Sequence, residues 1–233
     1  MTTSPQQTQL ALGFGHRPSL AGDDFLAAPS NAEALAWIDR WPDWPGPAVA
    51  LWGPPACGKT HLARLFEAIH GARLMTSCGI AAADPVELAA AGSPLILEDA
   101  ERAIEAGGKD FEEALFHIYN ALMESGGGLL LTAQNPPARW NLKLADLRSR
   151  LAAAAVAEIG PPGDAMIEAV LVKLFSDRQL KVEPDVIRYL TARMERSFAE
   201  AARLVGAIDG MALSRRRNVT VPLVREVLAN KTE

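Results

Sequence analysis

One short stretch, GPPACGKT at residues 53–60, constrains the fold of this chain more than any other. Four residues separate Gly53 from Gly58, and Lys59 and Thr60 follow directly, which is the pattern of a phosphate-binding loop. Glycine allows backbone N–H groups to turn toward an anion with no side chain in the way. In such a loop Lys59 would reach the β- and γ-phosphates of a nucleotide, and the Thr60 hydroxyl would bind Mg²⁺.

The residues on either side of the loop fit the same interpretation. Ala48–Trp52 is a short apolar run, as a buried parallel strand requires. Residues 61–71 have helical spacing, so a helix would begin at the loop and point its positive N-terminal end at the phosphates. The alternative is a Gly/Pro turn that contains Lys–Thr by chance. The strand before the loop and the helix after it favour nucleotide binding.

Composition narrows the class of protein. The 233 residues suffice for one or two domains, and 49% of them are hydrophobic, which allows a sizeable core. A net charge of −5 argues against a dedicated nucleic-acid binder. No apolar run approaches the roughly 18 residues of a membrane span, and the N-terminus lacks the features of a signal peptide. Cys57 and Cys78 form no disulfide framework, so we expect a cytoplasmic protein that contacts no membrane.

A second apolar run ends in two acids, as a site for a Mg²⁺-nucleotide complex requires. Leu95–Leu97 is followed by Glu98 and Asp99, so one carboxylate would lie beside the metal and the next could orient an attacking water. Glu98 stands where aspartate is usual, which points to a different metal geometry. A later apolar run leads to Gln134, which would either sense the γ-phosphate or belong to an ordinary turn.

Further apolar runs complete a predicted α/β fold, a five-stranded parallel sheet with helices on both faces. We expect further strands at 72–76, 129–132 and 156–159, and helices at 32–41, 80–91, 110–125 and 146–151. The sequence GPPG at 160–163 marks a domain boundary, because everything after it is helical in pattern. We therefore expect three parts: a flexible N-terminal segment at 1–22, a nucleotide-binding domain at 23–160 and a helical lid at 161–233.

Two smaller features allow more than one interpretation. In Gln9–Phe14 the apolar residues Leu10, Leu12 and Phe14 alternate with other residues, which suits an edge strand, a packing tail or a peptide that docks in a groove of a partner. Arg150, in the segment DLRSRL, is either surface charge or an arginine supplied to the nucleotide of a neighbouring subunit.

The motifs taken together resemble a known family. GPPACGKTHLA, LILEDAE, FHIYNALMESGG, LLLTAQNPP and DLRSRL occur in the order found in AAA+ proteins of the DnaA/Hda family, and the resemblance covers residues 9–230. It implies an AAA+ domain of strand order 5-1-4-3-2, followed by a helical lid. It also implies ADP or ATP as the cofactor, together with Mg²⁺. The phosphate loop alone is generic, whereas its combination with QLALGF at 9–14 is much more specific.

The resemblance implies a role for each motif. It places Thr60 and Glu98 at the metal, Asp99 and Gln134 at the γ-phosphate as catalytic residues, and Arg150 in a partner's site as an arginine finger acting in trans. The nucleotide would be bound by the phosphate loop and by a segment that lines the adenine pocket: Gly53, Pro54, Pro55, Ala56, Cys57, Gly58, Lys59, Thr60, His61, Asp24, Phe25, Leu26 and Asn31.

The resemblance also implies partners and an activity. QLALGF, through Gln9, Leu10, Leu12 and Phe14, is similar to the peptide by which regulatory members of the family bind the sliding clamp, the beta subunit of DNA polymerase III. The chain would then bind DnaA and act as a negative regulator of replication initiation, by stimulating hydrolysis of DnaA-bound ATP through Arg150. Because the chain stops after the lid helices, we expect no sequence-specific DNA binding. A homodimer is left open.

One departure from the family pattern concerns the lid. The arginine that senses the γ-phosphate in the family falls on Ala199 here, with Arg196 and Arg203 nearby. Without it we expect weak ATP hydrolysis by this chain itself, and ADP as the resting ligand. The alternatives are an autonomous AAA+ ATPase such as a helicase loader, a nucleotide-stabilised binding module without a catalytic role, and a truncated DNA-binding relative of the initiator.

Overall fold

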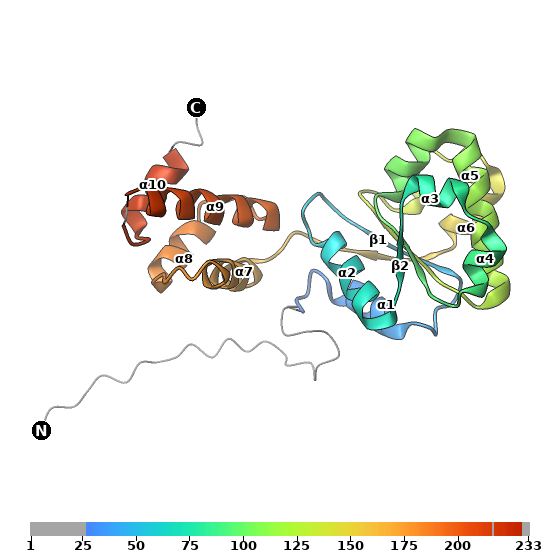
Figure 1. Ribbon diagram of the computed structural model, residues 1–233, viewed down its shortest axis with the longest axis horizontal. Helices are drawn as coiled ribbons and strands as arrows, with labels where there is room; N and C mark the ends of the chain where they lie inside the picture. The colour runs from blue at the N-terminus through green and yellow to red at the C-terminus, as the bar shows by residue number, and fades with distance from the viewer. Residues whose placement is uncertain (1–26, 216, 230–233) are drawn as a thin grey trace, which may run out of the picture.

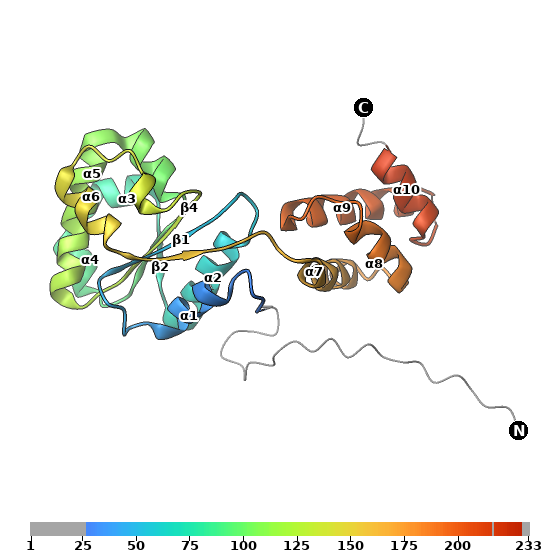
Figure 2. The ribbon, with the colours of Figure 1, turned by 180° about the vertical axis from the view of Figure 1, so that it is seen from behind.

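The computed structural model describes residues 27–215 and 217–229. It consists of an α/β core and a helical lid, joined by the segment that leaves the last strand (Figure 1). Seen from behind, the lid lies beyond one end of the core and does not cover a face of the sheet (Figure 2). The predicted binding residues in Gln9–Phe14 and Asp24–Leu26 lie outside the described part of the chain.

The core is built on one parallel sheet of five strands in the order β2-β3-β4-β1-β5, which confirms the predicted order. The strands are β1 (Ala48–Trp52), β2 (Arg73–Met75), β3 (Leu95–Leu97), β4 (Leu129–Ala133) and β5 (Ala155–Glu158). In the middle of β1, Ala50 pairs with Leu131 on one side and with Val156 on the other. The inner strands are continuous apolar runs because helices cover both faces of the sheet.

Alternate strand residues face two separate helical layers. One face packs against α1 (Ala32–Arg40) and α2 (Lys59–His70), through a cluster that includes Val49 and Leu130. The other face packs against α5 (Ala100–Ser125), α3 (Ser77–Ala82), α4 (Pro85–Ala90) and α6 (Ala145–Ala152). Successive side chains along each strand therefore point alternately toward one helical layer and toward the other.

Two predicted helices differ from the structure. The single helix expected at 80–91 is wrong, because two helices, α3 and α4, occupy this region. The Asp84 side chain accepts hydrogen bonds from the backbone N–H groups of Val86 and Glu87, and Pro85 fills the first helical position, so a new helix begins there. Helix α5 begins at Ala100 instead of near residue 110 and bends at Gly108, where the backbone is not helical.

The lid is helical, as the pattern after residues 160–163 predicts, with four helices in the described part of the chain. They are α7 (Asp164–Asp177), α8 (Pro184–Thr191), α9 (Phe198–Arg215) and α10 (Val221–Ala229). They enclose a hydrophobic cluster of their own, in which Phe175, Leu190, Leu204 and Val224 are fully buried. The bounds 23–160 and 161–233 stay predictions, but the lid cluster draws all its buried members from residues after 163. Among the described helices, none is long and apolar enough to span a membrane.

Candidate nucleotide-binding site

The phosphate loop lies between β1 and α2, where both of its flanking glycines are required by close contacts. A Cβ on Gly53 would lie 2.2 Å from the carbonyl oxygen of Ile159, which follows β5. Gly58 has a φ of +109° and lies against the ring of Phe198 from the lid, so a Cβ there would be strained and only 3.2 Å from that ring. The loop therefore packs closely against the residue that follows β5 on one side and against the lid on the other.

Lys59 is the first residue of α2, at the end of the loop, and it is largely buried. Its Nζ donates hydrogen bonds of 2.8 Å to the carbonyl oxygens of Gly53 and Pro54, and Cys57 Sγ lies 3.7 Å from the same nitrogen. The ammonium group is therefore held at the loop by backbone oxygens, which a phosphate oxygen could replace as the acceptor.

A cavity of about 590 Å³ opens over the loop and the ends of the strands. Most of the predicted phosphate and catalytic residues line it: Pro55, Ala56, Gly58, Lys59, Thr60, His61, Asp99 and Gln134. Its wall also contains Arg64, Arg102, Phe198 and Ala199. Neither arginine was predicted from the sequence, although Arg102 follows Asp99 by three residues and helical spacing could have placed it on the same face.

The two acids after β3 point in different directions. Asp99 has a left-handed backbone conformation, donates its N–H to Thr132 Oγ1 at 3.1 Å and faces the cavity. Glu98 lies toward α2, where its charge contributes to raising the pKa of Arg64, after the larger effects of the hydrogen bond and charge of Glu67. Of the two residues that follow β3, Asp99 therefore lines the cavity, whereas Glu98 lies near Arg64 of α2.

The Glu98 carboxylate does not line the cavity, but one of its oxygen atoms suits a cation. Its Oε1 is buried and accepts no hydrogen bond from the described residues. A buried carboxylate oxygen without a partner costs free energy in the folded state, and a hard cation satisfies such an oxygen well. Glu98 and the Thr60 hydroxyl are the residues that would hold Mg²⁺ beside a bound nucleotide.

At the tip of β4, two adjacent polar residues have different environments. The Asn135 side chain donates to Glu101 Oε1 at 3.0 Å, and the Asn135 backbone N–H donates to Glu101 Oε2 at 3.2 Å. Gln134 is exposed and lines the cavity. Of the two, Gln134 is thus the residue that could contact a terminal phosphate or a water.

A second, more apolar cavity of about 280 Å³ lies at the junction of core and lid. It is lined from the core by Asn31, Cys57, Gly58, His61 and Leu62, and from the lid by Met166, Val170, Lys173, Leu174, Phe198 and Ala202. Its place beside the phosphate loop and its apolar walls suit a flat base. Asn31 was predicted here, and its Oδ1 accepts a hydrogen bond of 2.8 Å from the N–H of Ala28 instead of capping α1.

The lid touches the phosphate loop through the first residue of α9. Phe198 lines both cavities, and its backbone N–H donates to the carbonyl oxygen of Ala56 at 3.4 Å. Ala56 itself has a positive φ of 57°, so the loop turns sharply where the lid meets it. A change in the conformation of the loop would therefore displace the first residue of α9, which contacts it directly.

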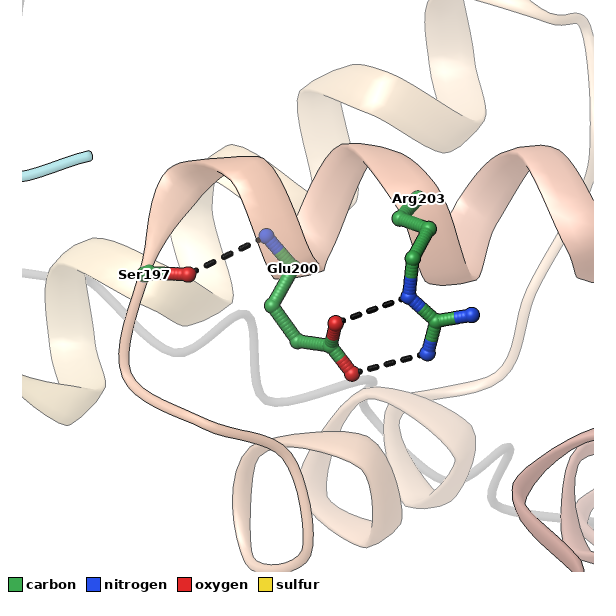
Figure 3. A network of polar contacts seen from close by, with 3 residues as sticks. All are labelled: Ser197, Glu200 and Arg203. Atoms are coloured by element: carbon green, nitrogen blue, oxygen red, sulfur yellow. Dashed lines mark hydrogen bonds and ion pairs between the residues drawn. The ribbon is translucent and has the colours of Figure 1, made fainter. Parts of the chain in front are cut away.

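Ala199, where the sequence comparison with the family predicts that the sensing arginine is missing, lines the phosphate cavity. Arg196 forms an ion pair with Asp164 at 2.8 Å. Arg203 donates two hydrogen bonds, of 2.8 and 2.9 Å, to the carboxylate of Glu200 (Figure 3). Both neighbouring arginines are engaged within the lid, and neither lines the cavity.

Ser197, directly before α9, and Glu200, in the first turn of α9, interact. The Glu200 N–H donates to Ser197 Oγ at 3.1 Å (Figure 3). The hydrogen bond from Arg203 to the Glu200 carboxylate also raises the pKa of that guanidinium, against a small opposing effect of burial. Hydrogen bonds among Ser197, Glu200 and Arg203 thereby stabilise the first turn of α9.

Arg150 lies away from this site, on α6, and lines neither cavity. Its guanidinium carbon is 5.3 Å from the centre of the Phe116 ring and 5.7 Å from that of Tyr119, and its Nη1 is 3.7 Å from Met123 Sδ. Burial raises the pKa of the Tyr119 hydroxyl, and the Arg150 charge opposes that shift. The guanidinium is partly exposed on an aromatic surface of α5, where a neighbouring molecule could meet it.

Comparisons with known proteins match both parts of the chain. Residues 164–228 match the family model described as Hda, lid domain. Domain III of the Thermotoga maritima replication initiation protein DnaA has a TM-score of 0.72 and 17% identity, over 88% of this chain and 94% of that one. The AMPPCP-bound DnaA of Aquifex aeolicus has a TM-score of 0.63 and 18% identity, over 82% of this chain and 67% of that one.

A Thermotoga maritima RuvB mutant is also similar in structure, with a TM-score of 0.67 and 16% identity, over 89% of this chain and 70% of that one. At such identities the structural similarity shows the fold alone. The evidence for the family is the match of the lid to the family model. Residues 164–228 are thus a lid domain of the Hda family, joined to an α/β core with the AAA+ fold found in DnaA.

Proposed function

We propose that this protein is a negative regulator of bacterial replication initiation, which binds ADP or ATP and stimulates hydrolysis of the ATP bound to DnaA. The observation that supports this most is the combination of an Hda lid domain with an arginine, Arg150, that lies outside the protein's own cavity. An arginine so placed has no role at its own nucleotide and is available to a neighbouring one.

Arg150 would act as an arginine finger. The terminal phosphoryl group becomes more negative at its outer oxygens as it is transferred, and a guanidinium brought there from a partner stabilises that charge. Such a finger accelerates hydrolysis by roughly 10³–10⁵-fold. DnaA would supply its own metal ion, attacking water and nucleotide contacts, so that the catalytic site is shared between the two proteins.

The protein's own nucleotide would occupy the two cavities around the phosphate loop. Lys59 would bind the phosphates, and the apolar cavity between Asn31 and α7 would receive the base. Thr60 and Glu98 would hold Mg²⁺, which would neutralise negative charge on the phosphates. Asp99 and Gln134 line the cavity, where they would orient a water toward the terminal phosphate.

Hydrolysis by this protein itself would be slow. Ala199 offers no charge to the γ-phosphate from the lid, and Arg196 and Arg203 are bound to other side chains. ADP would then remain bound after one turnover. The nucleotide would act mainly by fixing the contact between the phosphate loop and Phe198, and hence the position of the lid.

We further propose that Gln9–Phe14 binds the DNA polymerase III sliding clamp. The support is the alternation of apolar residues in QLALGF and its similarity to clamp-binding peptides. Binding to a clamp on DNA would bring Arg150 to DnaA where replication has begun, and reinitiation would be suppressed.

A nucleotide-stabilised binding module is the second candidate. The observation that favours it is the contact of Arg150 with Phe116 and Tyr119, because a stacked arginine can serve packing alone. In that case the protein would bridge DnaA and the clamp without accelerating hydrolysis.

The test is ATP hydrolysis by DnaA with this protein, nucleotide and DNA-loaded clamp, each omitted in turn. The proposed function predicts stimulation only when all are present. Unchanged hydrolysis with the complete mixture would favour the binding module. Strong hydrolysis by this protein without DnaA would instead identify an autonomous ATPase.

A further inference from the structure

Two arginines without a predicted role, Arg64 and Arg102, line the phosphate cavity. Arg102, in the first turn of α5, lines the cavity together with Asp99 and Gln134. It is exposed, and within the described residues it takes part in no hydrogen bond or ion pair. An arginine side chain carries several donors and a permanent charge, so an unpaired one in a phosphate cavity is suited to an anion.

The other cations near the cavity are engaged. Lys59 Nζ donates to two carbonyl oxygens of the loop. Arg64, the second arginine of the cavity, forms an ion pair with Glu67 at 2.8 Å. The lid contributes no charge through Ala199. Of the two arginines that line the cavity, Arg102 is therefore the one whose guanidinium forms no ion pair with a described residue.

The position of Arg102 matches the terminal phosphate better than the inner ones. It follows Asp99 by one turn of α5, on the same side of the helix, and Asp99 and Gln134 lie at the ends of β3 and β4. They line the cavity together with the loop that would cradle the inner phosphates. A guanidinium there would meet a γ-phosphate, which ADP lacks.

We propose that Arg102 is the residue by which this protein distinguishes nucleoside triphosphate from diphosphate. It would bind the terminal phosphate from the core by charge-assisted hydrogen bonds, in place of a lid arginine. Recognition of the third phosphate would then not require the lid to move. This inference rests on the proposed nucleotide binding at the phosphate loop, and it goes beyond that proposal by naming the specificity residue.

The experiment is a titration of the full chain with ADP and with AMPPCP, in the presence of Mg²⁺ and without DnaA or clamp. Arg102→Ala is expected to weaken AMPPCP binding about tenfold or more, as for the loss of a hydrogen bond between charged groups, and to change ADP binding much less. Arg102→Lys should keep part of the preference. Arg139→Ala, an exposed arginine outside the cavity, should change neither affinity.

A compensating substitution makes the test sharper. Ala199→Arg, added to Arg102→Ala, should restore AMPPCP affinity, because it places a guanidinium in the same cavity from the lid. Melting temperatures should be equal for wild type and Arg102→Ala, since the side chain has no partner to lose. Equal weakening of both nucleotides by Arg102→Ala, or weakening of neither, overturns the inference, as does a wild-type chain that binds neither nucleotide.

The outcomes separate this inference from the proposed function. A selective loss of AMPPCP affinity supports the role of Arg102 even if the protein fails to stimulate DnaA, which would contradict only the regulatory activity. Conversely, DnaA stimulation with no nucleotide selectivity at Arg102 contradicts only the inference made here about the cavity.

Discussion

The carboxylate of Glu112 accepts a hydrogen bond of 2.7 Å from the backbone N–H of Leu144, directly before α6 begins. The N–H of Lys143 donates to the same carboxylate at 2.9 Å. Helix α6 has no side-chain cap of its own, so a fully buried acid on α5 performs that role from a distance in sequence. The contact ties α6, and with it Arg150, to α5.

Glu112→Ala should lower the free energy of unfolding by about 2 kcal/mol, because it leaves two partly buried N–H groups without their charged acceptor. Glu112→Gln should cost less, since an amide oxygen still accepts one of the hydrogen bonds. Urea denaturation measures both. Glu113→Ala, one residue along and half-exposed, is the control and should leave the midpoint nearly unchanged. Equal midpoints for Glu112→Ala and Glu113→Ala would contradict this role.

Gly58→Ala should destabilise the protein by about 1–2 kcal/mol, since the residue has a φ of +109°. It should also weaken nucleotide binding, because the new Cβ presses on Phe198 and displaces the loop. Thermal unfolding and a nucleotide titration measure the two effects. Gly163→Ala, where a Cβ meets nothing within 4 Å, is the matched control. A Gly58→Ala variant with wild-type stability and affinity would show that the loop is looser than the structure indicates.

Glu98→Gln should reduce the dependence of nucleotide affinity on Mg²⁺, since it removes the charge of the orphaned carboxylate. Affinity is measured with Mg²⁺ and again with EDTA. Wild type should bind several times more tightly with the metal, whereas the variant should show little difference. Glu105→Ala, an exposed acid on the same core, should behave as wild type. A variant that keeps the full Mg²⁺ effect would exclude Glu98 as a ligand.

The sequence was informative where a function needs consecutive residues. The phosphate loop, Glu98–Asp99 and Gln134 follow strands directly, so apolar runs located them, and the structure brings Asp99 and Gln134 to the loop. The sheet order followed from the family resemblance, because parallel strands carry no local signal of their neighbours.

The missed features depend on contacts between distant residues. Glu112 lies among the apolar positions of α5 and looks like an ordinary helix residue until α6 packs against it. Arg102 was passed over because α5 was expected to begin only near residue 110, which left Arg102 outside any helix. The division between α3 and α4 was signalled locally by Asp84 and Pro85, and the alanine-rich composition concealed it.

Gln9→Ala combined with Leu12→Ala should weaken binding to the sliding clamp about tenfold or more, as expected when an anchor of a docking peptide is removed. Surface plasmon resonance with immobilised clamp measures the affinity. Gln7→Ala is the control and should bind as wild type. Nucleotide affinity should be equal in all three proteins. If the double variant bound the clamp as tightly as wild type, the clamp contact would have to lie elsewhere in the chain.

The central claim is that Arg150 completes the catalytic site of DnaA, and single-turnover hydrolysis of DnaA-bound ATP with DNA-loaded clamp tests it most directly. Arg150→Ala should lower the stimulated rate by about 10³-fold, and Arg150→Lys should recover little, because a lysine cannot reproduce the planar guanidinium. Arg148→Ala, on the same helix, should retain most of the stimulation. Stimulation by Arg150→Ala at the wild-type rate would contradict the account.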